Sequence, residues 1–553
     1  MHRFRFVGLL SLVVLSVITA FPQSPQLGSI NFPTSGSPQA QAAFLRGVAA
    51  MHSFWYEEAL EAFQESTKLD PGFAMGHWGE AMTYNHPIWL QQDAEPARRA
   101  LARIKEVSKL TPRERAFIEA ARILYGEGDK LARDLAYAAA MEKMYREYPD
   151  DLEIATFYSL SLLGTVRPGD KGYVRQMKAG AVALEVYQKN PDHPGAAHFV
   201  IHAFDDPEHA ILALPSAFRY AQIAPAASHA RHMPSHIFLQ LGMWAEAAAS
   251  NETAWKVSDD WVKSKNLALS LRDYHSNHWL TYIYCQQGRF SKAEGLINYL
   301  RQTMKDHGRE SVRWYDDTVA ALIVESRRWD LAAKLFDPSP APAAGDDHSS
   351  HASHGAAPAA NPKPAAAQTM VPNTRRGMSL PLFVRALAAA GNGSPDAEKL
   401  LAEMRAHRGQ SSDAYGAKIL EIRELEIAAL IAASKKNFDE AMTAMKRATA
   451  LEEEMSPPSG PPTLIKPSHE LFGEILLGTG KPQEASKQFA TALARQPNRA
   501  RSLLGLARAA AQSGNKATAI ESYTKLLGIW KQADANLPEV REAREFIGQA
   551  STR

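Results

Sequence analysis

Histidines gather in the middle of the chain at spacings that suit a metal ion. Nine of the 19 histidines fall between His193 and His278. In HFVIHAFDD, His198 and His202 are four residues apart and Asp205 follows three residues later, so a helix would place all three on one face. Two histidines at this spacing can bind Zn²⁺, Cu²⁺ or Ni²⁺ together, and a neighbouring carboxylate can complete or orient the set.

Two later segments repeat this pattern of histidines at three- and four-residue spacing. They are SHARHMPSHIF (228–238) and DYHSNHWLTYIY (273–284). Each segment precedes the second helix of an expected hairpin, so each should be the first helix of its own hairpin. The candidate metal ligands are therefore His198, His202, Asp205, His229, His232, His236, His275 and His278.

Helix spacing limits how many of these histidines can share one ion. Packed helices lie about 8–10 Å apart, so imidazoles from two adjacent helices can meet, whereas three helices in a row span too far. The preferred site combines one pair from each of two segments, and the remaining histidines would surround it or form a neighbouring site. That preferred set is His198, His202, His232 and His236. Pro234 has no backbone N–H group to donate to the helical hydrogen-bond pattern, so its helix either begins there or bends there.

The elements that must position these histidines show a 34-residue period near the end of the chain. The period relates three pairs of small or aromatic residues: Gly473 and Ala507, Ala485 and Ala519, and Phe489 and Tyr523. An earlier copy has small, small, aromatic and terminating residues at Gly47, Ala59, Phe63 and Pro71. The small residues let two helices approach closely, and the aromatic residue fills the gap beside them. In this pattern the chain resembles the tetratricopeptide repeat family of helical solenoids.

This resemblance implies an all-α, tetratricopeptide-like superhelical solenoid whose first helices line a concave groove. The candidate histidines fall at groove-facing positions of three consecutive repeats, so they would point into one cleft. We expect one disordered linker, rich in Pro, Ala and His, to interrupt the solenoid. The expected segments of the chain are a signal peptide at 1–20, a leader at 21–37, an N-terminal array at 38–336, the linker at 337–373 and a C-terminal array at 374–553. One pair of helices is expected over 96–149, and MSPPSGPPTLIKP (455–467) predicts a break between helices of the second array.

The N-terminus predicts export. Arg3 and Arg5 precede an apolar run that ends at Ala20, which is typical of a signal peptide cleaved after Ala20; an uncleaved N-terminal anchor is the alternative. Without those two arginines, 60 basic residues balance 60 acidic ones, because the full chain has 62 and 60. No basic excess favours nucleic acid, and no other apolar run predicts a transmembrane span. The mature protein is expected in the periplasm or outside the cell.

Catalytic motifs are weak. HFVIH lacks the glutamate of a zinc-protease helix, and Cys285 lies among apolar residues as an inert thiol. The sequence contains no recognisable catalytic base or nucleophile, so an enzymatic function is less favoured than a binding function. The sequence favours an exported scaffold that binds a protein or peptide in its groove, with a histidine-rich subsite. The alternatives are a transition-metal protein or metalloenzyme on a repeat frame, and a structural assembly factor of the cell envelope.

Overall fold

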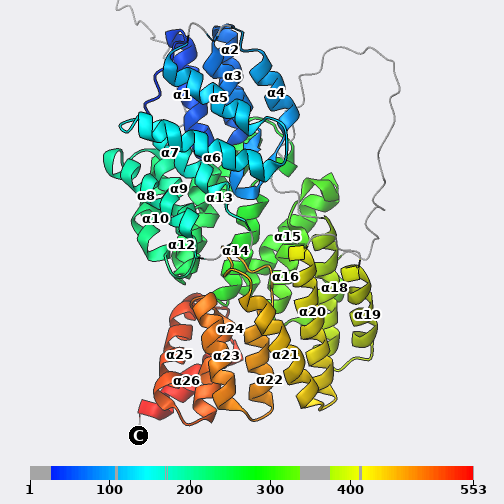
Figure 1. Ribbon diagram of the computed structural model, residues 1–553. Helices are drawn as coiled ribbons and strands as arrows, with labels where there is room; N and C mark the ends of the chain where they lie inside the picture. Colours follow the sequence, from blue (N-terminus) through cyan, green and yellow to red (C-terminus); the bar gives the residue numbers. More distant parts are fainter. Residues whose placement is uncertain are drawn as a thin grey trace, which may run out of the picture.

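The computed structural model describes residues 26–336 except 106, 108, 109, 168, 169 and 171, and residues 374–551 except 410–413. Helices follow one another as antiparallel pairs, with α1–α13 in one body, α15–α26 in a second and α14 between them (Figure 1). The all-α solenoid expected from the sequence is confirmed. The expected signal peptide (1–20), residues 21–25 of the leader and the linker (337–373) lie outside the described residues.

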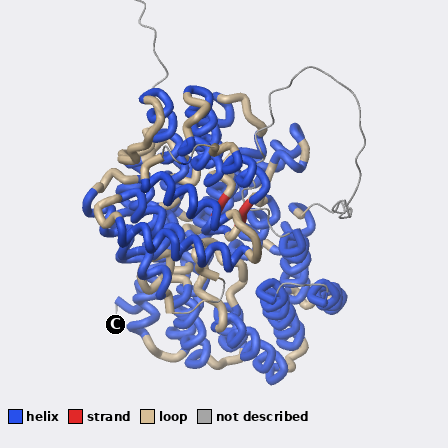
Figure 2. The backbone as a smooth tube through the Cα atoms, turned by 45° about the horizontal axis from the view of Figure 1, so that its top comes forward, coloured by secondary structure: helices blue, strands red, loops and turns tan. Residues whose placement is uncertain are grey.

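The first body begins with an extended segment and then runs through paired helices. Its helices are α1 Pro38–His52, α2 Tyr56–Leu69, α3 Ala74–Met82, α4 Ala94–Ala102, α5 Pro112–Leu124, α6 Lys130–Glu147, α7 Leu152–Leu163, α8 Val174–Lys189, α9 Pro194–Ala203, α10 Ala210–Ile223, α11 Ser228–His232, α12 Pro234–Gln240 and α13 Trp244–Ser264. A short hairpin of β1 Asn85–His86 and β2 Gln91–Gln92 encloses the turn η1 Pro87–Trp89 (Figure 2).

The remaining helices continue the array to the C-terminus. They are α14 Tyr274–Gln286, α15 Phe290–His307, α16 Tyr315–Ser326, α17 Ala332–Leu335, α18 Thr374–Gly391, α19 Asp396–Gly409, α20 Ala414–Ser434, α21 Phe438–Glu453, α22 Ser468–Gly478, α23 Pro482–Arg495, α24 Ala500–Gln512, α25 Lys516–Ile529 and α26 Pro538–Ser551, with 3-10 turns at Leu269–Leu271, Arg309–Ser311, Trp329–Leu331 and Trp530–Gln532. Within the described residues, no helix is both long and apolar enough to cross a bilayer.

Two stretches differ from the sequence expectation. The region 96–149 was expected to hold one pair of helices, but it holds α4, α5 and α6, because Pro112 begins a new helix behind the capping box of Thr111 and Glu114. A β-hairpin was not expected either. Its strands are only two residues long, and Leu90 turns the chain with a φ of 57°.

The repeat packing depends on an aromatic ring held between two glycines. A Cβ on Gly47 would lie 2.7 Å from the ring of Phe63, and one on Gly79 would lie 2.4 Å from it. At the other end of the chain, Phe489 is enclosed in the same way by Gly473 and Gly505, at 2.8 and 2.2 Å. Each ring therefore joins its own hairpin to the next one, as the 34-residue period indicates.

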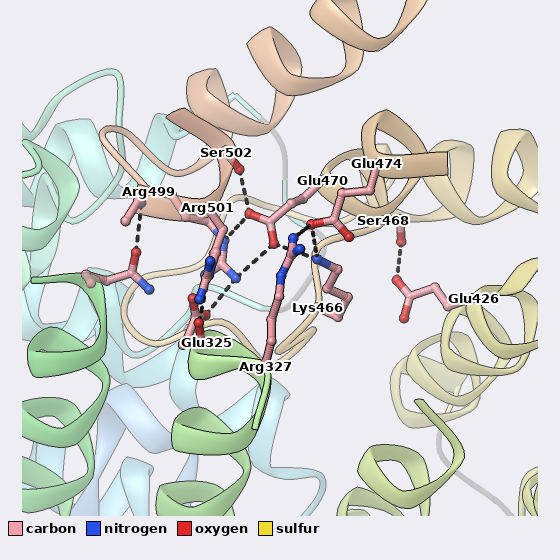
Figure 3. Close-up of polar contacts among 12 residues, drawn as sticks. Glu325, Arg327, Glu426, Lys466, Ser468, Glu470, Glu474, Arg499, Arg501 and Ser502 are labelled. Carbon is pink, nitrogen blue, oxygen red and sulfur yellow. Dashed lines mark hydrogen bonds and ion pairs between the residues drawn. The ribbon is translucent and has the colours of Figure 1, made fainter. Parts of the chain in front are cut away.

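The C-terminal repeats are fixed to the middle of the array by a buried charge network. Arg499 is 1% exposed and pairs with Glu325 of α16 and Glu470 of α22, each at 2.7 Å (Figure 3). Its Nη1 also donates to the hydroxyl of Tyr282 on α14 at 3.0 Å. Because Arg499 precedes α24, one side chain connects three separate parts of the fold. The geometry of α14, which carries candidate histidines, is therefore coupled to the C-terminal repeats.

The first body also closes on itself. Lys265, just after α13, lies 3.0 Å from Glu58 and 2.7 Å from Glu61 of α2, although these residues are more than 200 positions apart. Beside this ion pair, the rings of Trp55 and Trp261 meet edge to face at 5.6 Å. These contacts connect α2, near the start of the first body, to the end of α13.

Candidate metal centre

The first histidine set consists of His198, His202 and His229. Helix α9 supplies the first two and α11 the third, and one ring nitrogen from each lies within 4.8 Å of the others. The Nδ1 of His198 donates to the carbonyl oxygen of His52 at 2.7 Å, which leaves the lone pair of its Nε2 directed at His229 Nε2, 3.2 Å away. The Nε2 of His202 is buried with no hydrogen-bond partner among the described residues. The three nitrogens therefore lie close enough together to bind one metal ion.

The second histidine set consists of His232, His236 and His275, which come from α11, α12 and α14. One nitrogen from each again lies within 4.8 Å of the others. The Nε2 atoms of His232 and His236 are 3.1 Å apart. Trp279 packs against all three rings, at centroid distances of 4.7, 4.3 and 5.5 Å. The set is therefore held in a dry, aromatic surrounding.

Hydrogen bonds on the far side of the second set fix which nitrogen carries the proton. The carboxylate of Asp205 can only accept, so His236 Nδ1 donates to it at 2.6 Å. Asn251 donates its amide to the carbonyl of Ala247, so its oxygen faces His232 and accepts from Nδ1 at 2.7 Å. The two Nε2 atoms are therefore left facing each other, where one cation could bind both of them, and this arrangement of outer hydrogen bonds is typical of metal-binding histidines.

The structure divides the predicted residues differently from the preferred combination. His198 and His202 share a site with His229, and His232 and His236 share one with His275. The division falls within α11, because His229 of this helix belongs to the first set and His232 to the second. Pro234, which lacks a backbone donor, begins α12, so the segment 229–236 forms two short helices, and His236 of α12 joins His232 in the second set.

The two sets are neighbours. The ring centroids of His202 and His236 are 5.9 Å apart, and those of His229 and His232 are also 5.9 Å apart. Among the remaining predicted ligands, Asp205 orients His236, while His278 belongs to neither set. The His278 ring stacks on Trp314 at 5.7 Å with an interplanar angle of 14°.

In a third histidine set, not foreseen from the sequence, both Nε2 atoms are held by a carboxylate. His52 and His193 each place Nε2 against one oxygen of the buried Glu153, at 2.8 and 3.1 Å. Burial would raise the pKa of Glu153, but the two imidazoles outweigh it and hold the pKa well below its usual range. His193 Nδ1 accepts from the backbone of Ala196, so its Nε2 donates to the carboxylate. This set supports the first one, because the His52 carbonyl orients His198.

A loop from the C-terminal half covers the second set. Residues 456–467 cross Trp279 so closely that a Cβ on Gly460 would lie 2.3 Å from the indole. Gln240 fixes this loop, because its amide donates to the carbonyl of Pro458 at 2.9 Å and to Asp205 at 3.2 Å. The sequence marked this stretch only as a break between helices, but the structure makes it part of the candidate centre.

Both sets reach an aromatic pocket, which has a cavity of about 150 Å³. His229 and His275 line it, one from each set. The other lining rings are Phe54, Trp55, Tyr56, His86, Trp89, Trp261, Tyr274 and Trp314. The charged residues of the wall are Glu57, Arg272, Asp273 and Arg313, and Arg272 lies 2.9 Å from Asp259. The pocket is therefore a ring-lined approach to the candidate metal centre, with equal numbers of acidic and basic residues in its wall.

Two of the residues that supply these rings have an unusual backbone conformation. Phe54 has a φ of 52° and Trp314 a φ of 59°, in the left-handed region that favours glycine or asparagine. Such a conformation costs an aromatic residue about 1–3 kcal/mol, and it concentrates at functional sites. Phe54 uses it to place its ring against His198, His202 and His229, at 4.3, 5.6 and 5.5 Å.

Burial favours the neutral form of five of the six histidines of the two sets. It lowers the pKa of His198 and of His275 to about 3, helped by neighbouring histidines. The same causes hold the pKa values of His202, His229 and His232 well below the usual value. A neutral imidazole is the form that binds a metal ion.

Several residues of the centre carry no signal in the sequence. Asn251, Trp279 and Trp314 come from separate helices or loops and meet only in the folded chain. The sequence predicts a loop at Pro457, Pro458 and Gly460, but it does not predict which part of the fold that loop contacts. One signal was available for Phe54, because it directly follows a helix whose end needs a left-handed residue.

The comparisons with known proteins identify the repeats. Residues 40–73 and residues 471–538 match family models described as tetratricopeptide repeat. The chain contains tetratricopeptide repeats. The matched segments hold the two glycine-enclosed rings, Phe63 and Phe489, so the family match and the packing agree. Repeats of this kind build binding surfaces for other proteins, which makes the chain a repeat scaffold of the protein-interaction class.

The similar solved structures are distant. A human IFIT1 dimer with PPP-AAAA is 12% identical, with 89% of this chain and 91% of that chain covered and a TM-score of 0.33. The P58(IPK) TPR domain is 14% identical, with 73% and 99% covered and a TM-score of 0.21. The Cut9–Hcn1 hetero-tetramer of APC/C is 12% identical, with 94% and 78% covered and a TM-score of 0.23. Scores this low carry no argument about function. No curated protein matches the chain.

Proposed function

We propose that this tetratricopeptide-repeat protein binds transition metal ions in its two histidine sets. One observation carries the proposal: the Nε2 atoms of His232 and His236 face each other at 3.1 Å while Asp205 and Asn251 hold both Nδ1 protons. A cation between the two Nε2 atoms could bind both of them, and burial favours the neutral, metal-binding form of His232 because it lowers the pKa of that ring well below its usual value.

The donor chemistry narrows the metal. Three imidazoles and no thiolate suit Zn²⁺, Cu²⁺ or Ni²⁺. Asp205 and Asn251 would orient the ligands through their hydrogen bonds. The first set offers three further imidazoles next to the second, so two ions per chain are expected. Whether the bound ions carry out a reaction is a separate question from binding, and the proposal concerns binding.

Metal titration of the purified mature protein tests this. We expect about two equivalents of Cu²⁺ or Zn²⁺ by calorimetry and by elemental analysis after dialysis. His232→Ala with His236→Ala should remove one equivalent, and His198→Ala with His202→Ala should remove the other. His469→Ala is the matched control, because His469 is also buried but bonds Gln488 in the C-terminal repeats. Equal stoichiometry in all variants that keep the wild-type circular dichroism spectrum would contradict the proposal.

A second candidate function, binding of a protein or peptide in the groove, is supported by the aromatic pocket. Tryptophan and tyrosine are the side chains that most often anchor a binding partner, and the pocket offers Trp55, Tyr56, Trp89 and Trp261. Affinity capture with the wild type and with Trp89→Ala tests this candidate. A partner retained equally by both would place its binding surface outside the pocket.

Export is also part of the proposal, and it rests on the pattern of residues 1–20 alone. We expect the mature chain to begin at Phe21. Mass spectrometry of the N-terminus after cell fractionation checks this. An intact N-terminus in the cytoplasmic fraction would contradict export.

A further inference from the structure

The aromatic pocket has the size of one ring. Its cavity is about 150 Å³, and a cavity of about 150 Å³ engineered in an unrelated protein binds benzene. Nearly all of its large lining side chains are aromatic, including Trp55, Trp89 and Trp314. Aromatic walls favour a planar guest through stacked and edge-to-face contacts, each worth about 0.5–1.5 kcal/mol beyond the area buried. The space and its walls therefore fit a single aromatic ring.

The wall also holds polar atoms without partners. Tyr56 Oη, Trp261 Nε1 and His275 Nδ1 are buried, and they make no hydrogen bond with any described residue. An unmade hydrogen bond of this kind costs about 1–3 kcal/mol. A guest that carries a hydroxyl group on its ring could satisfy such an atom after a small side-chain rotation. Toluene, which has no hydroxyl group, could not.

The histidine sets border the same space. His229 of the first set and His275 of the second both line the pocket. A hydroxyl group at this end would lie beside the ligands of the proposed metal ions. The charged residues of the wall are two acidic ones, Glu57 and Asp273, and two basic ones, Arg272 and Arg313, so they add no net charge that would attract an ion. An uncharged ring therefore suits the pocket better than a charged one.

We propose that the aromatic pocket binds a phenol ring with its hydroxyl group directed toward the histidine sets. The orientation toward metal rests on the proposed function, whereas binding of the ring does not. The ring could come from a free phenol or from a tyrosine side chain of a peptide. Both sources present the same chemistry to the pocket.

Calorimetry on the metal-free full-length mature chain tests the ring. The probes are p-cresol, toluene, which lacks the hydroxyl group, and cyclohexanol, which lacks the aromatic ring. We expect p-cresol to bind saturably and at least as tightly as toluene, and cyclohexanol to bind at least ten-fold more weakly. No saturable binding of p-cresol, or a clear preference for toluene, would overturn the proposal. Since no metal is present, this result does not depend on the metal proposal.

Two variants on α13 locate the site. Val257 lines the pocket, so Val257→Trp should fill it and weaken p-cresol binding at least ten-fold. Lys256→Trp adds the same side chain at an exposed neighbouring position and should leave binding unchanged. Equal effects of the two substitutions would overturn the assignment of the pocket. Trp261→Phe keeps a ring but removes the indole N–H, and it should reduce the preference for p-cresol over toluene even if Val257→Trp fails to fold.

Two further experiments identify the source of the ring and its orientation in the pocket. Displacement of p-cresol by N-acetyltyrosinamide would assign the pocket to tyrosine side chains, and failure to displace it would assign the pocket to small phenols. In the Cu²⁺-loaded protein, a hydroxyl group at the metal should give a visible phenolate-to-copper charge-transfer band with p-cresol but not with toluene. Saturable p-cresol binding without that band would overturn the orientation and leave both ring and metal binding intact.

Discussion

Arg499 and Glu470 form a buried ion pair, with Nε and Oε2 2.7 Å apart and both side chains 1% exposed. Glu325 completes the pair from the opposite side at 2.7 Å (Figure 3). Two carboxylates thus share one guanidinium group where the C-terminal repeats meet α16. Removing the guanidinium would leave both carboxylates in a place that solvent does not reach.

We therefore expect Arg499→Met to destabilise the protein by about 3–5 kcal/mol, which is the usual loss when one partner of a buried ion pair is removed. Thermal unfolding, together with hydrogen exchange in α22–α24, would measure this loss. Arg508→Met is the control, because its pair with Glu542 is about one third exposed on both sides. A comparable loss in both variants would contradict the role assigned to burial.

The glycines around Phe489 give a second prediction. Gly505→Ala would place a Cβ 2.2 Å from the Phe489 ring, so we expect a loss of about 1–3 kcal/mol from overpacking. Gly528→Ala on the neighbouring α25 meets nothing within 4 Å and should be neutral or slightly stabilising. Hydrogen exchange of the α23–α24 peptides measures the difference. A loss with Gly528→Ala as large as with Gly505→Ala would show that the close approach is not the cause.

Glu426 should make stability depend on pH. Burial raises its pKa to about 8, opposed by the hydrogen bond from Ser468, which is 2.7 Å away. The unfolded chain releases this proton near pH 4.5 while the folded chain retains it up to about pH 8. The folded state therefore binds more protons in this window, and its stability falls as the pH rises, by about 1.4 kcal/mol per pH unit from this group.

We expect Glu426→Gln to flatten that slope and to be more stable than the wild type at pH 8.5. Urea unfolding between pH 5 and pH 8.5 is the measurement. Glu440→Gln changes an exposed glutamate on α21 and should leave the slope as it is. An unchanged slope in Glu426→Gln would mean that Glu426 is ionised in the folded protein.

Local patterns predicted the fold well, since each repeat packs mainly on its neighbours. Phe489 and Gly473 were found because their contacts lie within one hairpin and recur 34 residues later at Tyr523 and Ala507. Gly505, which encloses the same ring from the next hairpin, lies two positions away from that period and was not found. The helix count between 96 and 149 was wrong because a capping box, rather than a period, begins α5. Capping depends on two residues and is easily missed among charged side chains.

The candidate site could be predicted only in part. The histidines were found by their spacing, but the division into two sets falls between His229 and His232 of the one helix α11, which spacing along the sequence does not reveal. Asn251, Trp279 and the loop at 456–467 reach the site through tertiary contacts between distant segments. Spacing along one helix therefore identified which residues could bind a metal, and packing decided which of them meet.

Asp205 supplies the last prediction, because its carboxylate holds the Nδ1 proton of His236 and so directs Nε2 toward His232. An Asp205→Asn substitution keeps the shape but removes the charge and allows the amide group to face the ring. We expect Cu²⁺ or Zn²⁺ affinity at the second histidine set to fall about 10–100-fold, as for other groups that orient metal-binding histidines. Competition against a chelator of known affinity would measure this. Asp206→Asn is the matched control, since the adjacent Asp206 bonds His209 instead. If both substitutions weakened binding equally, the loss would reflect a general change of charge or fold, and the orienting role of Asp205 would be rejected.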